Sequence, residues 1–300
     1  LETVIFLIKH ILKMKKIGII VTLILVSGFL IFATTYQQNS NYFPASMEFA
    51  TEKVPLHMND VRERMDRELL VNQNLHSSTQ LIIKRAAVFF PIIEPILAKY
   101  NVPDDFKYLA VIESSLITTS VSKSGACGIW QFMKETALEK GLEISETVDE
   151  RYHVEKSTEA ACQYLLAAKT KFGSWTLAAA SYNGGMGGIA KQIESQQVDN
   201  YYDLLLTEET SRYVFRILAL KEIMKNPVLH GFNLQPNDLY KTIATRQVEV
   251  DTAITNLASF AKSQGINYKI LKLHNAWLRD KKLDNANKKK YSINIATEGY

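Results

Sequence analysis

The apolar residues between about residue 80 and residue 226 recur at the spacing of an α-helix, and this pattern restricts the fold more than any other feature. In successive segments they fall at positions i, i+3, i+4 and i+7, and no convincing run of alternating apolar and polar residues interrupts them. Gly173, Asn183 and Asn226 mark breaks between segments, and Pro91 is expected to divide the stretch 79–100 into two helices. The pattern predicts an all-α domain.

One predicted helix of this block has a carboxyl group on its apolar face. Pro103 fits the first turn of a helix, and Phe106, Leu109, Ala110 and Glu113 follow at i, i+3, i+4 and i+7. A carboxyl group on that face is partly desolvated, which raises its pKa and suits a general acid near neutral pH. The alternative is a structural acid that neighbouring groups cap or that a lysine pairs with, and the spacing alone does not separate the two.

Three further groups of residues are candidates for binding a sugar. Gln131 lies between two aromatic residues, and a buried amide needs hydrogen-bond partners such as hydroxyl or acetamido groups. Tyr182 and Asn183 precede two glycines, which allow a ligand to approach the backbone closely. Glu209 and Tyr213 begin the last helix of the block. Each group has a structural alternative, namely a core aromatic residue, a helix cap or a first-turn acid favoured by the helix dipole.

The chain on either side of the helical block has a different character. Residues 14–16 (Met-Lys-Lys) precede the apolar run 17–33, whose length lies between that of a signal-peptide core and that of a membrane helix. Residues 37–60 are polar and contain two prolines, which predicts a tether. After residue 233, alternating runs at 240–250 and 291–296 flank two helical stretches, which predicts a small α+β module.

These patterns divide the chain into four parts. They are a signal or membrane-anchor segment at 1–36, a linker with a lead-in helix at 37–78, the helical domain at 79–232 and the terminal module at 233–300. The net charge of +4 is too small to indicate nucleic-acid binding, and no metal-ligand spacing or nucleotide-binding glycine pattern occurs, so we expect no metal and no cofactor. The two cysteines, Cys127 and Cys162, are either a disulfide or two buried thiols.

Four short motifs occur in a fixed order in the helical block. They are Glu113-Ser114, then Gly125-Ala126-x-Gly128-x-Trp130-Gln131-Phe132-Met133, then Ala180-x-Tyr182-Asn183-Gly184-Gly185, and last Glu209-Thr210-x-x-Tyr213-Val214. Together they resemble the lytic transglycosylases with a soluble-lytic-transglycosylase (goose-lysozyme-like) domain, most closely the membrane-bound type D. The resemblance covers about residues 75–230. The terminal module does not match a clean LysM repeat, which does not favour glycan binding by that module.

The resemblance implies a fold, a substrate and a reaction. The fold would be mainly α, with a lysozyme-like all-α catalytic domain, a small C-terminal α+β module and an N-terminal membrane or signal helix. The substrate would be the β-1,4 bond from N-acetylmuramic acid to N-acetylglucosamine in peptidoglycan. Glu113 would protonate the leaving oxygen and then accept the proton of the muramic acid 6-hydroxyl group, which gives a 1,6-anhydro end without water. The implied substrate-binding residues are Ser114, Ser122, Gln131, Met133, Tyr182, Asn183, Glu209 and Tyr213.

The resemblance also implies a place of action and partners. The protein would act as a monomer on glycan strands in the cell envelope, at the periplasmic face, and its N-terminal helix would either hold it to the membrane or serve as a signal peptide for secretion.

The acidic residues themselves bear on the reaction. Most glycosidases use two carboxyl groups, but residues 114–134 contain no Asp or Glu, so a second acid shortly after Glu113 is missing. A hydrolytic muramidase would need a water-activating carboxylate within about 10 Å of Glu113. A protein that binds peptidoglycan without cleaving it would keep the cleft but have no need of the acid. Both remain alternatives to a transglycosylase.

Overall fold

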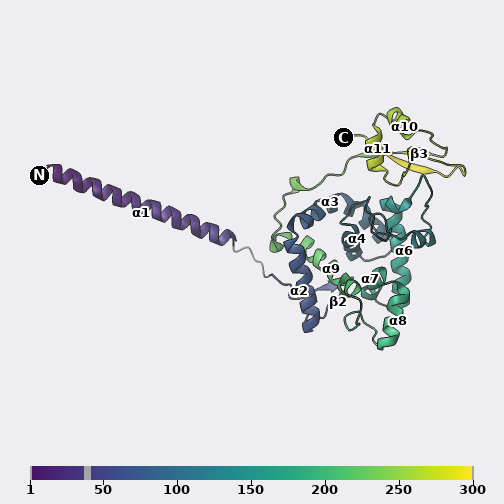
Figure 1. Cartoon of the computed structure of the whole chain (residues 1–300), viewed down its shortest axis with the longest axis horizontal. Helices are drawn as coiled ribbons and strands as arrows, with labels where there is room; N and C mark the ends of the chain where they lie inside the picture. The colour runs from purple at the N-terminus through teal and green to yellow at the C-terminus, as the bar shows by residue number, and fades with distance from the viewer. Residues whose placement is uncertain (1, 37–41, 299–300) are drawn as a thin grey trace.

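The computed structural model describes residues 2–36 and 42–298, and these are mainly helical, as predicted (Figure 1). The α-helices are α1 (Glu2–Tyr36), α2 (Asn59–Asn74), α3 (His76–Lys99), α4 (Lys107–Ser114), α5 (Lys134–Glu139), α6 (Val154–Phe172), α7 (Trp175–Gly184), α8 (Met186–Gln196), α9 (Glu208–Lys225), α10 (Leu257–Ser263) and α11 (Tyr268–His274). Short 3₁₀ turns span Asp104–Phe106, Glu150–Tyr152, Pro227–His230 and Pro236–Asp238. The apolar run 17–33 falls in α1. Across the described ranges, no helix combines the length and the apolar character needed to cross a membrane.

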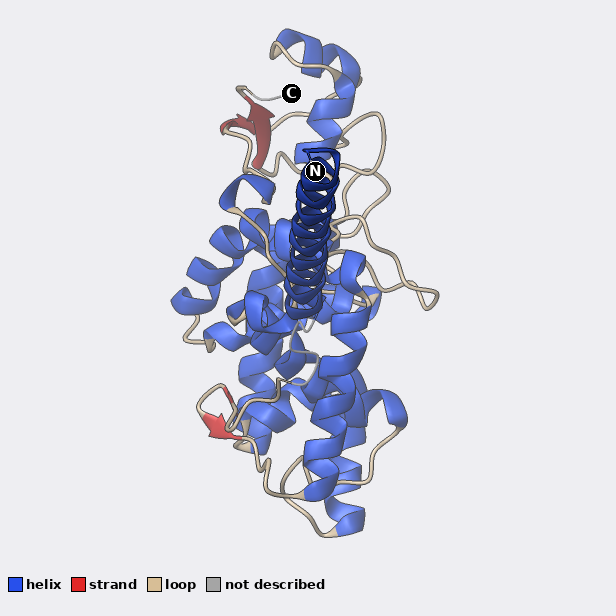
Figure 2. Ribbon diagram, turned by 90° about the vertical axis from the view of Figure 1, so that its left-hand side faces the viewer, coloured by secondary structure: helices blue, strands red, loops and turns tan. Residues whose placement is uncertain are grey.

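Two small antiparallel sheets complete the structure, and Figure 2 shows them well apart, one of them near the C-terminus. One pairs β1 (Glu48–Phe49) with β2 (Glu52–Lys53), and the other pairs β3 (Thr245–Val250) with β4 (Tyr291–Ala296). In the second sheet Thr245 faces Ala296 and Val250 faces Tyr291. The alternating runs of the terminal module therefore form strands, as the sequence predicts, and α10 and α11 lie between them in the chain.

The hydrophobic core of the helical body surrounds α4, which packs against α3 and α9. Leu109, Ala110 and Val111 are fully buried because this helix lies inside the body rather than on its surface. A second core lies under the C-terminal sheet and combines residues of the terminal module with residues of the helical body. The two cysteines are free and belong to different cores, Cys162 to the first and Cys127 to the second.

The segment expected to be a tether is packed onto the helical body. Phe49 is fully buried, with its ring 5.1 Å from that of Phe106 in an edge-to-face contact. The Glu52 carboxylate accepts hydrogen bonds from the backbone N–H groups of Trp175 (2.6 Å) and Thr176 (2.9 Å) and so caps α7 from outside. Residues 42–58 therefore differ from the prediction, because a few apolar side chains and one acid find partners far along the chain. Residues 37–41 lie outside the described residues.

Two predicted helix boundaries are wrong. Pro91 and Pro95 lie inside the single helix α3, because both are on its exposed face, where the freed backbone carbonyls can bind water. Ser157 and Thr158 are residue types that favour a helix cap and predict a start there, but helix α6 begins earlier, at Val154. The hydroxyl groups of those two residues instead donate back to backbone carbonyls of the preceding turn. The predicted ends at Gly173 and Asn226 are confirmed, and Thr207, a residue type that predicts a helix cap, does cap α9.

Candidate active site

Glu113 lies in the last turn of α4 with its carboxyl group removed from bulk water. Burial raises its pKa from 4.5 to about 7, so the group is half protonated near neutral pH. The Tyr213 hydroxyl donates a hydrogen bond to Oε1 of Glu113, which together with the positive charge of Arg216 opposes that rise. The negative charge of Glu209 adds to it. The prediction of a desolvated carboxyl group on this helix is therefore confirmed.

Helix α9 brings three of these neighbours to Glu113 from one face. Glu209, Tyr213 and Arg216 follow at i, i+4 and i+7, which places their side chains in one row. Tyr213 is 1 % exposed, and its burial raises the pKa of the phenol well above the usual value, so the hydroxyl remains a donor. Arg216 also donates to the backbone carbonyl of Ile112 at 3.1 Å, which fixes it against α4. Arg216 was missed in the sequence, although its spacing from Glu209 and Tyr213 was a signal for it.

Tyr182 reaches the same site from α7. Its hydroxyl donates to the backbone carbonyl of Trp130 at 2.9 Å, and its ring meets the Phe132 ring edge-to-face at 6.0 Å. Burial raises the pKa of this phenol well above the usual value, and the charge of Glu113 contributes to the rise. Tyr182 therefore stays protonated beside the acid and ties the residues before α5 to α7.

Asn183 connects the end of α7 to the start of α9. Its side-chain N–H donates to Glu209 Oε1 at 2.9 Å, and its carbonyl oxygen accepts from the Thr210 hydroxyl at 2.8 Å. Next to this group, Glu209 and Arg216 line a cleft of about 560 Å³ whose opposite wall includes Asn72 and Leu75 at the end of α2. The charges of both residues act on the pKa of Glu113, although Glu113 itself does not line this cleft.

The other predicted residues lie in or beside the loop 115–133. Ser114 is buried and donates to the backbone carbonyl of Ile129 at 2.8 Å. Gln131, in a left-handed conformation, donates its amide N–H to the carbonyls of Ser120 and Gly128. The Ser122 hydroxyl accepts from the backbone N–H of Ala126, and Met133 precedes α5 with 40 % of its side chain exposed.

The predicted residues therefore fall into two sets. Hydrogen bonds join Glu113 to Tyr213 and Asn183 to Glu209, while none within the described ranges joins Ser122 or Met133 to Glu113. The same ranges contain no group of three or more His, Cys, Asp or Glu residues arranged to hold a metal ion.

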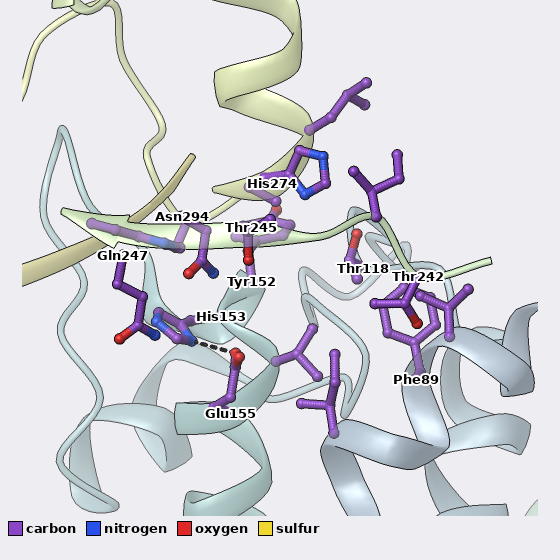
Figure 3. A pocket seen from close by; sticks show the side chains of 17 residues that line it. Phe89, Thr118, Tyr152, His153, Glu155, Thr242, Thr245, Gln247, His274 and Asn294 are labelled. Atoms are coloured by element: carbon purple, nitrogen blue, oxygen red, sulfur yellow. Dashed lines mark ion pairs between the residues drawn. The ribbon is translucent and has the colours of Figure 1, made fainter. Parts of the chain in front are cut away.

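A second cavity, of about 410 Å³, lies between the helical body and the terminal module (Figure 3). Nδ1 of His153 lies 3.1 Å from a carboxylate oxygen of Glu155, and the amide groups of Gln247 and Asn294 lie nearby in the view. Glu113 does not line this cavity. The acid and the space between the two parts of the chain are therefore separate features.

Comparison with known proteins gives two family matches. The description "Transglycosylase SLT domain" matches residues 90–204, and "Soluble lytic transglycosylase C-terminal LysM-like domain" matches residues 246–299. The chain is 30% identical over 233 residues to membrane-bound lytic murein transglycosylase D of Escherichia coli K12, which covers 76% of this chain and 50% of that protein. It is also 30% identical over 128 residues to peptidoglycan transglycosylase gp16 of Escherichia phage T7, covering 42% of this chain and 9% of that protein.

A solved structure is also similar to part of the chain. It is an inactive mutant of the lytic transglycosylase Slt from Pseudomonas aeruginosa, with a TM-score of 0.36 and 18% identity, and the match covers 51% of this chain and 26% of that one. The chain spans about half the length of the curated murein transglycosylase that it matches.

Proposed function

Because the chain contains a domain of the transglycosylase SLT family, which agrees with the predicted lysozyme-like class, we propose that it is a peptidoglycan lytic transglycosylase. It cleaves the β-1,4 bond between N-acetylmuramic acid and N-acetylglucosamine and leaves a 1,6-anhydro-muramic acid end. The observation that supports this most directly is Glu113, a buried carboxyl group with a pKa of about 7 that accepts a hydrogen bond from the phenol of Tyr213. We assign catalysis to residues 79–232 and the terminal module to residues 233–300.

Glu113 takes two roles in turn. As an acid it gives its proton to the glycosidic oxygen while the bond to C1 of the muramic acid breaks. As a carboxylate it then accepts the proton of the 6-hydroxyl group, whose oxygen forms the new bond to C1. The proton returns to Glu113, and no water enters. A pKa near the working pH suits this exchange, and the Tyr213 hydrogen bond with the Arg216 charge stabilises the carboxylate between the steps.

The sugar itself takes the place of a second protein carboxylate. In this proposal the carbonyl oxygen of the 2-acetamido group stabilises the positive charge that develops at C1. Glu209 is the acidic residue whose charge acts on Glu113, but its carboxylate is held by the Asn183 amide. We therefore assign Glu209 and Asn183 to binding the strand rather than to activating water.

We assign Gln131 to substrate binding through its remaining acceptor. Its N–H group is used by the loop, whereas its side-chain carbonyl oxygen accepts no hydrogen bond from any described residue. We assign Tyr182 to the same site, because the charge of Glu113 acts on its phenol and its hydroxyl is held by the carbonyl of Trp130. Substrate contacts from Ser114, Ser122 and Met133 stay predictions.

The place of action is the cell envelope, at the periplasmic face, and the protein acts there as a monomer. The support is the basic start at residues 14–16 followed by the apolar run 17–33, and the name of the Escherichia coli relative, which describes that protein as membrane-bound. Cell fractionation, with sequencing of the N-terminus of the mature chain, distinguishes a retained anchor from a cleaved signal peptide. Recovery of the chain in the cytosol would refute this location.

The deciding experiment is mass spectrometry of purified peptidoglycan after digestion by the full chain. Fragments lighter by one water than hydrolysis products demonstrate anhydro ends and hence transglycosylation. Reducing ends instead would refute the proposed reaction in favour of a muramidase. Glu113→Gln is the matched variant, and we expect it to fold normally and to release nothing. Cleavage by that variant would exclude Glu113 as the catalytic acid. No cleavage by folded wild type would instead favour a protein that binds peptidoglycan without cleaving it.

A further inference from the structure

We propose that the C-terminal module is a positioning element for the active site, which acts by holding the loop 115–133 in its shape. This inference rests on the proposed function for what the loop serves. A chain of four contacts leads from the module to Glu113, and each link is formed by side chains or backbone groups that are buried or paired.

The first link is a shared hydrophobic core. Cys127, Val148 and Tyr152 come from the helical body, yet they are buried in the cluster that contains Trp277 and Ile293 of the module. The Tyr152 hydroxyl donates to Sγ of Cys127 at 3.2 Å, so the core reaches directly into the loop. Removing the module would expose these three side chains to water. Because exposing apolar surface costs free energy, the loop would no longer be stable in its present conformation.

The second link is a short backbone pairing with ion pairs beside it. The N–H of Asp149 donates to the carbonyl of Trp277 at 2.9 Å, and the N–H of Arg279 donates to the carbonyl of Thr147 at 2.8 Å. Lys289 pairs with the carboxylates of Glu143 (2.5 Å) and Glu150 (3.0 Å). The backbone pairing and these ion pairs therefore both fall in the segment 143–152.

The third link joins that segment to the loop. The Arg151 guanidinium is almost fully buried and paired with Asp149 at 2.7 Å. Its other N–H groups donate to the carbonyls of Gly125 (3.1 Å) and Phe132 (3.3 Å), at the two ends of the loop's turn. Between those ends, Gly128 is so close to Arg151 that an added Cβ would lie 1.9 Å from its carbonyl oxygen. The turn is therefore shaped directly on Arg151.

The fourth link joins the loop to the reacting group. The carbonyl of Ile129 accepts from the hydroxyl of Ser114, the residue after Glu113, and the carbonyl of Trp130 accepts from Tyr182. A displacement of the turn would thus move both the end of α4 and a hydroxyl beside Glu113. A misplacement of about 1 Å in an active site can cost on the order of 100-fold in rate. Lys289, Asp149 and Arg151 are accordingly positioning residues.

The test compares one double variant of the full chain with two single variants. Lys289→Met with Tyr291→Phe removes the ion pairs and the hydroxyl contact to Glu143 while it leaves the core in place. Arg246→Met is the control, because that side chain contacts Gln264 within the module. Lys289→Arg, with Tyr291 unchanged, preserves the charge and should behave as wild type.

Two readouts are measured. The first is hydrogen exchange at the backbone N–H groups of Cys127, Gly128 and Phe132, which are bonded within the loop, relative to those of α9. We expect it to rise about tenfold in the loop alone in the double variant. The second is the rate of anhydro-product release, for which we expect kcat to fall about tenfold and KM to stay within about twofold.

Other outcomes overturn the positioning role. A higher KM at unchanged kcat would show that the module contributes to substrate binding rather than to positioning. If hydrogen exchange rises equally in α9 and Tm falls, the contacts only stabilise the fold. If exchange in the loop is unchanged, the module does not hold the loop. If wild type releases no anhydro product, the proposed function fails, but the exchange measurement still decides whether the module orders the loop.

Discussion

Among single residues, Glu113 has neighbours that act on its pKa in opposite directions. Removing one or the other should therefore shift the pH dependence of the reaction in opposite directions. Arg216 lowers the pKa and Glu209 raises it. The acid works in its protonated form, so the rate falls as the pH rises through its pKa. Glu209→Gln should therefore move the alkaline limb of the kcat/KM profile to lower pH, and Arg216→Gln should move it to higher pH. Arg216→Lys keeps the charge and is the control. Shifts of the same sign in the Glu209→Gln and Arg216→Gln variants would contradict the assignment.

The raised pKa of Glu113 also affects stability. Between the unfolded value of 4.5 and the folded value of about 7, the folded state binds more protons, so the free energy of unfolding falls as the pH rises through this window. Glu113→Gln does not titrate and avoids that loss. Relative to wild type, we expect it to gain up to about 3 kcal/mol between about pH 4 and about pH 8.

Urea unfolding of both proteins at the two pH values measures this gain. Glu139→Gln, at an exposed position of α5, is the matched control and should show no such change. A Glu113→Gln variant whose stability varies with pH as that of wild type does would show that Glu113 is not held in its protonated form by burial.

At the scale of elements, the turn at Gly128 should tolerate no side chain. Its φ of +80° lies in the left-handed region, and an added Cβ would collide with the backbone of Arg151. Gly128→Ala should therefore lower the free energy of unfolding by more than about 2 kcal/mol and reduce kcat. Gly125→Ala shares the positive φ but meets open space, so it should cost only about 1 kcal/mol. Equal costs in the two variants, measured by urea unfolding, would exclude the close approach.

Local pattern was sufficient to predict most elements but not their partners. The spacing of apolar residues gave α2, α4, α7 and the strands β3 and β4, because amphipathic faces and alternation are local properties. It failed at α3, where two exposed prolines do not break the helix, and at β1 and β2, whose polar sequence hides Phe49 and the cap Glu52. Whether proline breaks a helix or an acid finds a helix end depends on tertiary contacts.

In the candidate site, too, local pattern predicts the residues but not their partners. The apolar stripe predicts the desolvation of Glu113, and the motif order points to Tyr182, Asn183 and Tyr213. The contacts of Arg216 and Arg151 could not be predicted, because neither helical spacing nor a place in a loop says which groups a guanidinium will meet. Their roles depend on which backbone carbonyls and carboxylates the fold places beside them, as for Arg151 with Gly125 and Asp149.

For the whole molecule, the two cores are expected to unfold together, because the second core takes side chains from both parts of the chain. Each of the two native cysteines can be used to follow the unfolding of one core. Cys127 belongs to the second core and is 5% exposed, whereas Cys162 belongs to the first and is fully buried, with a thiol pKa raised to about 12 by desolvation. Neither should react with a thiol reagent in the native state.

Labelling at increasing urea concentration, read by mass spectrometry of the peptides, measures when each thiol becomes accessible. A common midpoint for Cys127 and Cys162, coincident with the loss of helical circular dichroism, is the expected result. Labelling of Cys127 at a clearly lower midpoint would mean that the module separates first. The loop beside Glu113 would then lose its support while the helical body remained folded, and activity should disappear at the Cys127 midpoint rather than at the Cys162 midpoint.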